Sequence, residues 1–359
     1  MKNKLLKITL VFLCAFLGFA GGHMAQKLSF TYSIGPLNIF LASMGFIILS
    51  FIIHIVMHET GHLIFGLITG YQFILIRFFS LTLIKTNHGY KLKSLKIPGT
   101  AGQCLMMPPK TMNEDFPTQL YNFGGLITNG VITLVALVLL VMFPVGPYMQ
   151  IFLTLLILLG IFAILVNGLI MEDTPNDGYN ASLLRHRSEL RPYFWLQLYV
   201  IGMKAQGKGY EEINPSFIKS IPLQDCDNPI GLTAQLIYIE SLKSNRERIE
   251  AYEALKDLEM IPIQKVFVDL DHASCLMLEG EVVEPTPMMN TIVKKIKGNP
   301  DCLKFEFLKA LVIENDEVRA SQILQNFEKE TKNYPYRHDV ALIYKELVDF
   351  KQEYCHADV

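Results

Sequence analysis

Residues 39–62 read IFLASMGFIILSFIIHIVMHETGH, a long apolar run that ends in the motif His58-Glu59-Thr60-Gly61-His62. On a helix, two histidines four positions apart lie on one face, so both imidazoles can reach a single zinc ion. A glutamate between them is placed to take a proton from water at the metal. The stretch therefore predicts an apolar helix that carries a zinc site, with His58 and His62 as ligands and Glu59 as the general base.

The apolar surroundings of this motif favour a functional interpretation over a chance match. Ionisable side chains at membrane depth are energetically costly, so those that persist there usually serve a function. His54 lies one turn earlier and shares the face of the two predicted ligands. We expect it to be a packed or water-facing histidine, with a place in the lining of the site as the alternative.

The composition indicates a membrane domain followed by a soluble domain. The chain is 51% hydrophobic and 18% charged, which is too apolar for a typical soluble protein. Residues 1–172 hold four acidic and ten basic side chains, and the rest of the chain holds 30 acidic and 22 basic ones. We expect a membrane domain over residues 1–187 and a cytoplasmic helical domain over residues 188–359. The net charge of -2 does not point to nucleic acid as a partner.

The cysteines are scattered, and no two of them form a C-x-x-C pair. This pattern is typical of free thiols in a reducing compartment, and it predicts neither disulfides nor cysteine ligands for zinc. The six residues are Cys14, Cys104, Cys226, Cys275, Cys302 and Cys355.

Four apolar stretches predict membrane spans, at residues 8–20, 39–68, 123–144 and 148–171. The first is short and follows three lysines, as in a signal peptide. No small-x-small cleavage site follows it, so we expect an uncleaved anchor. The fold class predicted for the membrane domain is therefore an all-α bundle of about four transmembrane helices.

The distribution of basic residues predicts the orientation of these spans. The N-terminus carries three lysines, the loop over residues 70–118 carries six basic residues, and three arginines follow the fourth span. The loops on the other side hold only Lys27. The positive-inside rule then predicts a multi-pass protein of the cell membrane with both termini in the cytoplasm. The predicted metal site falls near the cytoplasmic end of the second span.

The loop after the second span is rich in β-branched and aromatic residues at positions 73–79 and 81–84, and Asn87-His88-Gly89 supplies a turn signal. These features predict a small β hairpin in the cytoplasmic loop. It either offers an edge to an extended substrate or is a surface hairpin. Residues 103–109 are expected to form an apolar loop that dips into the membrane interface.

A zinc site needs a third protein ligand, and the end of the fourth span offers candidates on the same membrane side. Asp177 follows Pro175 by two positions and precedes a glycine, so the backbone can turn sharply and aim its carboxylate inward. Glu172 and Asp173 are alternatives on geometry alone.

With these motifs in order, the first half of the chain resembles the site-2 protease family of intramembrane zinc metalloproteases. That family has His-Glu-x-x-His in one transmembrane helix and Asn…Pro-x-Asp-Gly at a later one, which Pro175-Asn176-Asp177-Gly178 matches here. The resemblance implies that His58, His62 and Asp177 bind Zn²⁺ and that Glu59 is the catalytic base.

The intervening helix carries a further element of this resemblance. Gly125-Leu126-Ile127-Thr128-Asn129 is similar to the family's Gly-Pro-x-x-Asn element, without its proline. The resemblance implies that Asn129 binds the substrate or forms hydrogen bonds within the active site.

The second half of the chain predicts a soluble helical domain. Amphipathic stretches of helix length occur at residues 231–260, 263–279, 301–314, 317–331 and 339–353. Helices of this size suggest either a tetratricopeptide-like array or an ordinary helical bundle. We expect such a domain to bind a peptide or protein partner, or to hold the membrane domain in place.

Together these features predict a zinc-dependent intramembrane endopeptidase that hydrolyses transmembrane or membrane-associated peptides near the cytoplasmic face. Its substrate is expected to be a regulatory protein or the precursor of a short secreted peptide. The alternative is a catalytically silent membrane scaffold whose helical domain recruits a partner.

Overall fold

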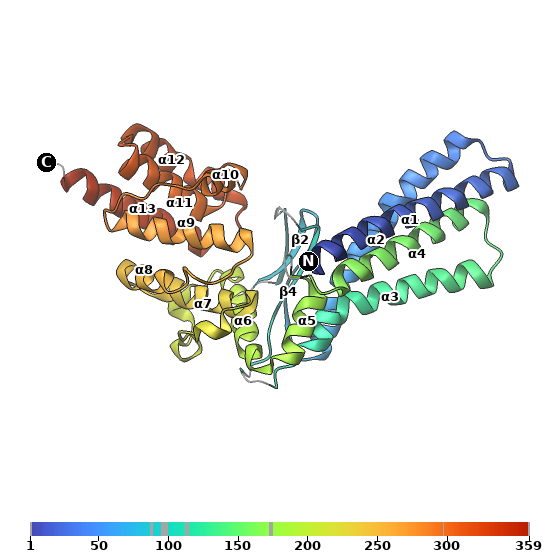
Figure 1. The fold of residues 1–359 in the computed structure, drawn as a ribbon, viewed down its shortest axis with the longest axis horizontal. Coiled ribbons are helices and arrows are strands. Elements are labelled where there is room, and N and C mark those ends of the chain that lie inside the picture. Colours follow the sequence, from blue (N-terminus) through green and yellow to red (C-terminus); the bar gives the residue numbers. More distant parts are fainter. Residues whose placement is uncertain are drawn as a thin grey trace. The chain divides into compact units, whose positions relative to one another are not determined.

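The computed structural model describes residues 2–86, 89–94, 100–110, 112, 115–171, 175–296 and 298–357, which are mostly helical with a small antiparallel sheet (Figure 1). The chain divides into two compact units. The first comprises Met1–Phe79, Thr100–Pro109 and Asp115–Glu189. The second comprises Ser80–Gly99, Lys110–Glu114 and Leu190–Val359.

The first unit is built on five helices: α1 (Lys2–Tyr32), α2 (Pro36–Ile68), α3 (Gln119–Met142), α4 (Pro147–Gly168) and α5 (Asp177–His186). Three of these, α2, α3 and α4, are long and apolar enough to cross a membrane. The predicted first span falls within α1, where the structure describes few of the side chains, so a fourth span stays a prediction. Pro36 and Pro147 occupy first turns, where the missing N–H has no partner to lose.

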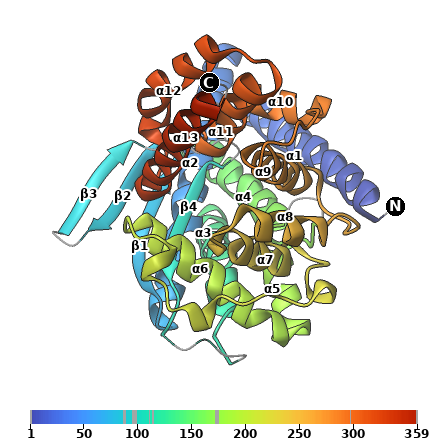
Figure 2. The same ribbon diagram turned by 90° about the vertical axis from the view of Figure 1, so that its left-hand side faces the viewer.

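Two strands of the first unit pair beside the helices (Figure 2). Strands β1 (Gln72–Phe78) and β4 (Gly102–Met107) run antiparallel with Ile76 opposite Cys104, and β4 has no other strand neighbour in the described part of the chain. The expectation of an apolar loop at residues 103–109 is therefore wrong. Cys104, Leu105 and Met106 are consecutive and all buried, so the segment lacks the polar alternation by which a half-exposed strand is recognised.

The second antiparallel pair confirms the predicted hairpin. Strands β2 (Leu81–Thr86) and β3 (Gly89–Ser94) place Leu83 opposite Leu92. Two residues of the predicted turn, Asn87 and His88, lie outside the described residues.

The second unit contains the helices α6 (Arg191–Ala205), α7 (Pro229–Ser241), α8 (Asn245–Glu253), α9 (Pro262–Leu278), α10 (Pro287–Lys295), α11 (Pro300–Leu308), α12 (Glu317–Glu330) and α13 (Arg337–Ala357). One of its hydrophobic cores includes Phe305, Phe307 and Phe327. The single helix expected over residues 231–260 is wrong, because the backbone becomes extended at Leu242. Asn228 and Asn299 cap helices that begin with proline, a strong start signal. A tetratricopeptide-like array stays a prediction.

Candidate metal centre

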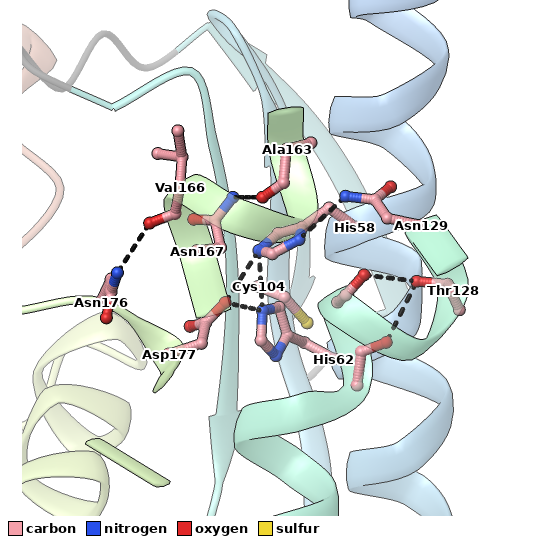
Figure 3. A network of polar contacts seen from close by, with 12 residues as sticks. His58, His62, Cys104, Thr128, Asn129, Ala163, Val166, Asn167, Asn176 and Asp177 are labelled. Atoms are coloured by element: carbon pink, nitrogen blue, oxygen red, sulfur yellow. Dashed lines mark hydrogen bonds and ion pairs between the residues drawn. The ribbon is translucent and has the colours of Figure 1, made fainter. Parts of the chain in front are cut away.

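Three side chains from two helices converge at the end of α2 that leads into β1 (Figure 3). His58 and His62 come from α2, and Asp177 is the first residue of α5. Oδ2 of Asp177 lies 3.0 Å from Nε2 of His58 and 3.3 Å from Nε2 of His62, and the two Nε2 atoms are 3.1 Å apart. Within the described part of the chain, these three side chains form the group whose geometry can hold a metal ion.

The size of this triangle fits zinc. Tetrahedral bonds of about 2.0–2.1 Å place two ligand atoms roughly 3.3 Å apart, close to all three observed separations. Oδ2 of Asp177 is buried, and no group among the described residues donates a hydrogen bond to it in suitable geometry. The nearest groups to this oxygen are the Nε2 atoms of His58 and His62, at 3.0 and 3.3 Å. The carboxylate is therefore available as an anionic ligand.

His62 is held in the tautomer that a metal ligand needs. Its Nδ1 lies 2.8 Å from the carbonyl oxygen of Tyr121 in α3. A carbonyl can only accept, so Nδ1 carries the proton and the lone pair of Nε2 is directed toward Asp177. A backbone carbonyl behind a histidine is a common support for a metal ligand.

His58 is supported by a longer chain of hydrogen bonds through Asn129 and His54. His54 Nε2 lies 2.8 Å from the carbonyl oxygen of Leu156 and donates to it, because a carbonyl can only accept. The Asn129 amide lies 3.1 Å from His54 Nδ1 and 3.4 Å from His58 Nδ1. The Asn129 side-chain oxygen faces Nδ1 of His54, and its nitrogen faces Nδ1 of His58 (Figure 3). Asn129 thus joins His54 to His58 and can hold the His58 ring in its orientation.

This series of hydrogen bonds adds detail to two expectations from the sequence. His54 is buried, as expected for a packed histidine, but it is also one step removed from a candidate ligand. Asn129 is buried between the two histidines, where it can position His58. A contact between Asn129 and a substrate stays a prediction.

Close contact between α2 and α3 makes this support possible. A side-chain carbon added at Gly61 would meet the backbone of Gly124, and one added at Gly125 would meet the His58 ring. Thr128 donates from Oγ1 to the carbonyl oxygen of Met57 at 2.8 Å and so bridges the same two helices. Small residues let membrane helices approach closely enough for such polar contacts. The glycines therefore bring Asn129 within reach of His58.

Substituting Gly125 is expected to disturb the metal centre directly. In Gly125→Ala the new methyl group must displace the His58 ring, and we expect zinc affinity to fall about 10–100-fold, as for loss of a supporting residue. Gly130→Ala is the matched control on the same helix, because a methyl group there meets open space. Competition with a chelator of known affinity measures the difference, and equal zinc affinity in the two variants would contradict this account.

Contacts between the start of α5 and the end of α4 position Asp177. Asn176 accepts a hydrogen bond from the N–H of Tyr179 and donates to the carbonyl oxygens of Val166 and Leu169 at the end of α4, both at 2.7 Å. One amide thus caps both helix ends and joins them. A side-chain carbon at Gly178 would meet the backbone of Gly168, so the glycine after the aspartate permits this contact.

Asn167 lies near the end of α4, the helix that precedes this turn. Asn167 donates to Ala163 within its own helix at 3.0 Å. Glu172 and Asp173, the alternatives for the third ligand, lie outside the described residues.

The side chain of Glu59 in α2 is buried against Gly102, the first residue of β4. A side-chain carbon at Gly102 would meet the Glu59 carboxyl group, so the absence of a side chain there makes room for it. Arg77 fixes this part of the sheet, since its guanidinium donates to the carbonyl oxygens of Phe79 at 2.6 Å and Thr100 at 3.2 Å. Burial lowers the pKa of Arg77, and the charge of Glu59 opposes that shift. No local pattern around Arg77 signals this role.

Cys104 in β4 lies near the two histidines (Figure 3). Burial, followed by the charge of Glu59, raises the pKa of its thiol well above its usual value. Cys104 is not a member of the group of side chains with metal-binding geometry in the described part of the chain. No protein-family model, curated protein or solved structure matches the chain.

Proposed function

We propose that the chain is a zinc-dependent intramembrane endopeptidase of the site-2 protease type. The observation that carries this proposal is the convergence of His58, His62 and Asp177 at one point of a helix long enough to cross a membrane, with Glu59 in the same motif. Zinc held by these three residues would supply Lewis acidity, which lowers the pKa of water and polarises a peptide carbonyl.

The residues of the chain supply the remaining chemistry. Glu59 takes the proton that water loses as its oxygen adds to the carbonyl carbon, and then gives a proton to the nitrogen that leaves. Its position between the two ligand histidines keeps it beside the attacked bond, while Tyr121 sets the tautomer of His62 and Asn129 orients the His58 ring. The peptide bond is thereby exchanged for a carboxylate and an amine.

The edge of the sheet supports a peptide as substrate. Strand β4 begins at Gly102 beside Glu59 and pairs on one side with β1. An extended segment of a transmembrane or membrane-associated peptide can add to the other side and place a backbone carbonyl near Glu59. We propose a multi-pass arrangement in the cell membrane with both termini in the cytoplasm and cleavage near the cytoplasmic face, based on the basic loops.

The alternative is a catalytically silent scaffold whose helical domain recruits a protein partner. A scaffold requires neither a proton acceptor between the two histidines nor a buried carbonyl that sets the tautomer of His62. The proposed protease accounts for both.

Metal removal tests the proposal. Full-length protein in liposomes, mixed with synthetic transmembrane peptides whose cytoplasmic ends contain glycine, should cleave some of them. 1,10-Phenanthroline should reduce cleavage to background and added zinc should restore it, whereas the non-chelating 1,7 isomer should have no effect. Cleavage that continues after zinc has been shown to be removed would contradict the proposal.

A further inference from the structure

The second unit encloses a cavity of about 510 Å³, within the range of small-molecule sites. Helices α6, α7, α9, α11 and α13 contribute to its walls. Its lining holds more acidic than basic side chains: Glu240, Asp271, Asp301, Asp339 and Glu346 against Lys204, Arg248 and Lys304. None of these residues belongs to the proposed metal centre, so a ligand of the cavity is independent of the proposed function.

The basic side chains of this cavity already have partners. Lys204 lies 3.0 Å from Glu240 and 3.1 Å from Asp339. Lys304 lies 2.6 Å from Glu346. Three of the five carboxylates are thus paired with two lysines, one of which is shared.

Arg248 is engaged as well. Its guanidinium donates to the carbonyl oxygens of Leu242 at 2.8 Å and Glu240 at 3.1 Å. The basic groups of the wall are therefore used to hold the wall together.

Asp271 of α9 and Asp301 of α11 are the two acidic residues of the lining that form no ion pair with these lysines. Among the described residues, neither carboxylate forms an ion pair or a hydrogen bond. Both side chains line the cavity and remain partly accessible. Burial and the charge of Asp301 raise the pKa of Asp271, while burial and the charge of Glu240 raise the pKa of Asp301 to about 6. Two neighbouring carboxylates that form no ion pair of their own destabilise the fold, a cost typical of binding sites.

The chemistry of the lining selects the ligand. The excess of carboxylates in the lining would repel a negatively charged ligand. Calcium takes six to eight oxygen ligands, and no cluster of three metal-ligating side chains lies here among the described residues. Tyr252, Tyr334 and Tyr336 add aromatic rings that can face a cation.

We propose that this cavity binds the primary ammonium group of a small ligand, with Asp271 and Asp301 as its counter-charges and the tyrosine rings around its apolar body. The ammonium group belongs to a free amine or to the N-terminus of a short peptide. Both sources offer three N–H donors to the two carboxylates.

Calorimetry on the detergent-solubilised full-length chain at pH 7.5 tests this assignment and separates the two sources. The probes are cadaverine, the tripeptide Gly-Leu-Ala with a free N-terminus, its N-acetylated form and glutarate. We expect cadaverine, the free tripeptide or both to bind, and the acetylated tripeptide and glutarate not to bind. Binding of neither amine, or equal binding of the free and acetylated tripeptides, would overturn the proposal.

Variants of the two aspartates complete the test. Asp271→Asn and Asp301→Asn should each weaken amine binding about 10–100-fold, the usual effect of losing a charge-assisted contact. Asp349→Asn, an exposed carboxylate on α13 outside the cavity, is the matched control and should bind as the wild type does. Unchanged binding in both cavity variants would overturn the assignment of Asp271 and Asp301.

Stability distinguishes a binding role from a structural one. Asp301→Asn removes a repulsive charge, so its melting temperature at pH 7.5 should rise while amine binding falls. A fall in both would mean that the carboxylate is needed for folding, and would overturn the proposal.

The pH dependence has a definite sign. With a pKa of about 6 in the folded chain and 3.8 as the ordinary value, Asp301 binds a proton more readily when folded. Stability should therefore rise as pH falls from 7 toward 5, and this rise should be smaller in Asp301→Asn. The other groups around Asp301 are Asp271, Glu240 and Asp339, with Lys204 and Lys304 opposing them.

Discussion

Glu59→Gln is expected to abolish peptide cleavage, by several orders of magnitude, while leaving zinc binding and the fold unchanged. Glutamine has nearly the same shape, but its amide cannot accept the proton from the attacking water. Glu59 is not one of the three convergent ligands, so zinc content should match that of the wild type. The measurement is cleavage of a membrane peptide in liposomes, with zinc determined on the same preparation.

Thr60→Ala is the matched control within the same motif. The Thr60 hydroxyl bonds back to the carbonyl oxygen of Val56 in its own helix at 2.7 Å, so its loss should leave cleavage near the wild-type level. Full cleavage by Glu59→Gln with zinc still bound would contradict the protease and favour the scaffold.

Asp177→Ala is expected to lose both zinc and cleavage. It removes the one anionic ligand, and two imidazoles four positions apart on a helix do not complete a zinc site. Zinc should fall from about one per chain to near background after a chelator wash. Glu189→Gln, an exposed carboxylate of the same unit, is the control and should keep its zinc.

The same experiment decides between the candidates for the third ligand. Glu172→Ala and Asp173→Ala should retain zinc. Retention of zinc by Asp177→Ala together with its loss from Glu172→Ala would assign the third ligand to Glu172.

Local patterns predicted the parts of the centre that depend on local geometry. The spacing of His58 and His62 places them on one helical face whatever the surroundings, and the structure brings them to Asp177. Their supporting contacts depend on how closely two helices approach. The paired glycines Gly124 and Gly125 are a signal for such an approach, but a glycine pair does not say which polar side chain the neighbouring helix receives.

The remaining differences have a similar origin. Strand β4 was missed because both of its faces are buried, which removes the alternation that identifies a strand. The cavity of the second unit joins residues from helices far apart in sequence, such as Lys204 and Asp339, and no local pattern predicts that meeting. The partner of His54 Nε2 is the carbonyl oxygen of Leu156, which lies on another helix and cannot be identified from the sequence around His54.

Zinc K-edge absorption spectroscopy of the purified wild-type chain tests the central claim most directly. We predict about one zinc per chain, with a first shell of nitrogen and oxygen atoms at about 2.0–2.1 Å and scattering from two imidazoles. Asp177→Ala should lose this signal, and Glu59→Gln should keep it. A sulfur shell at about 2.3 Å, which would bring Cys104 into the site, or a chain purified without any zinc, would contradict the His58–His62–Asp177 centre.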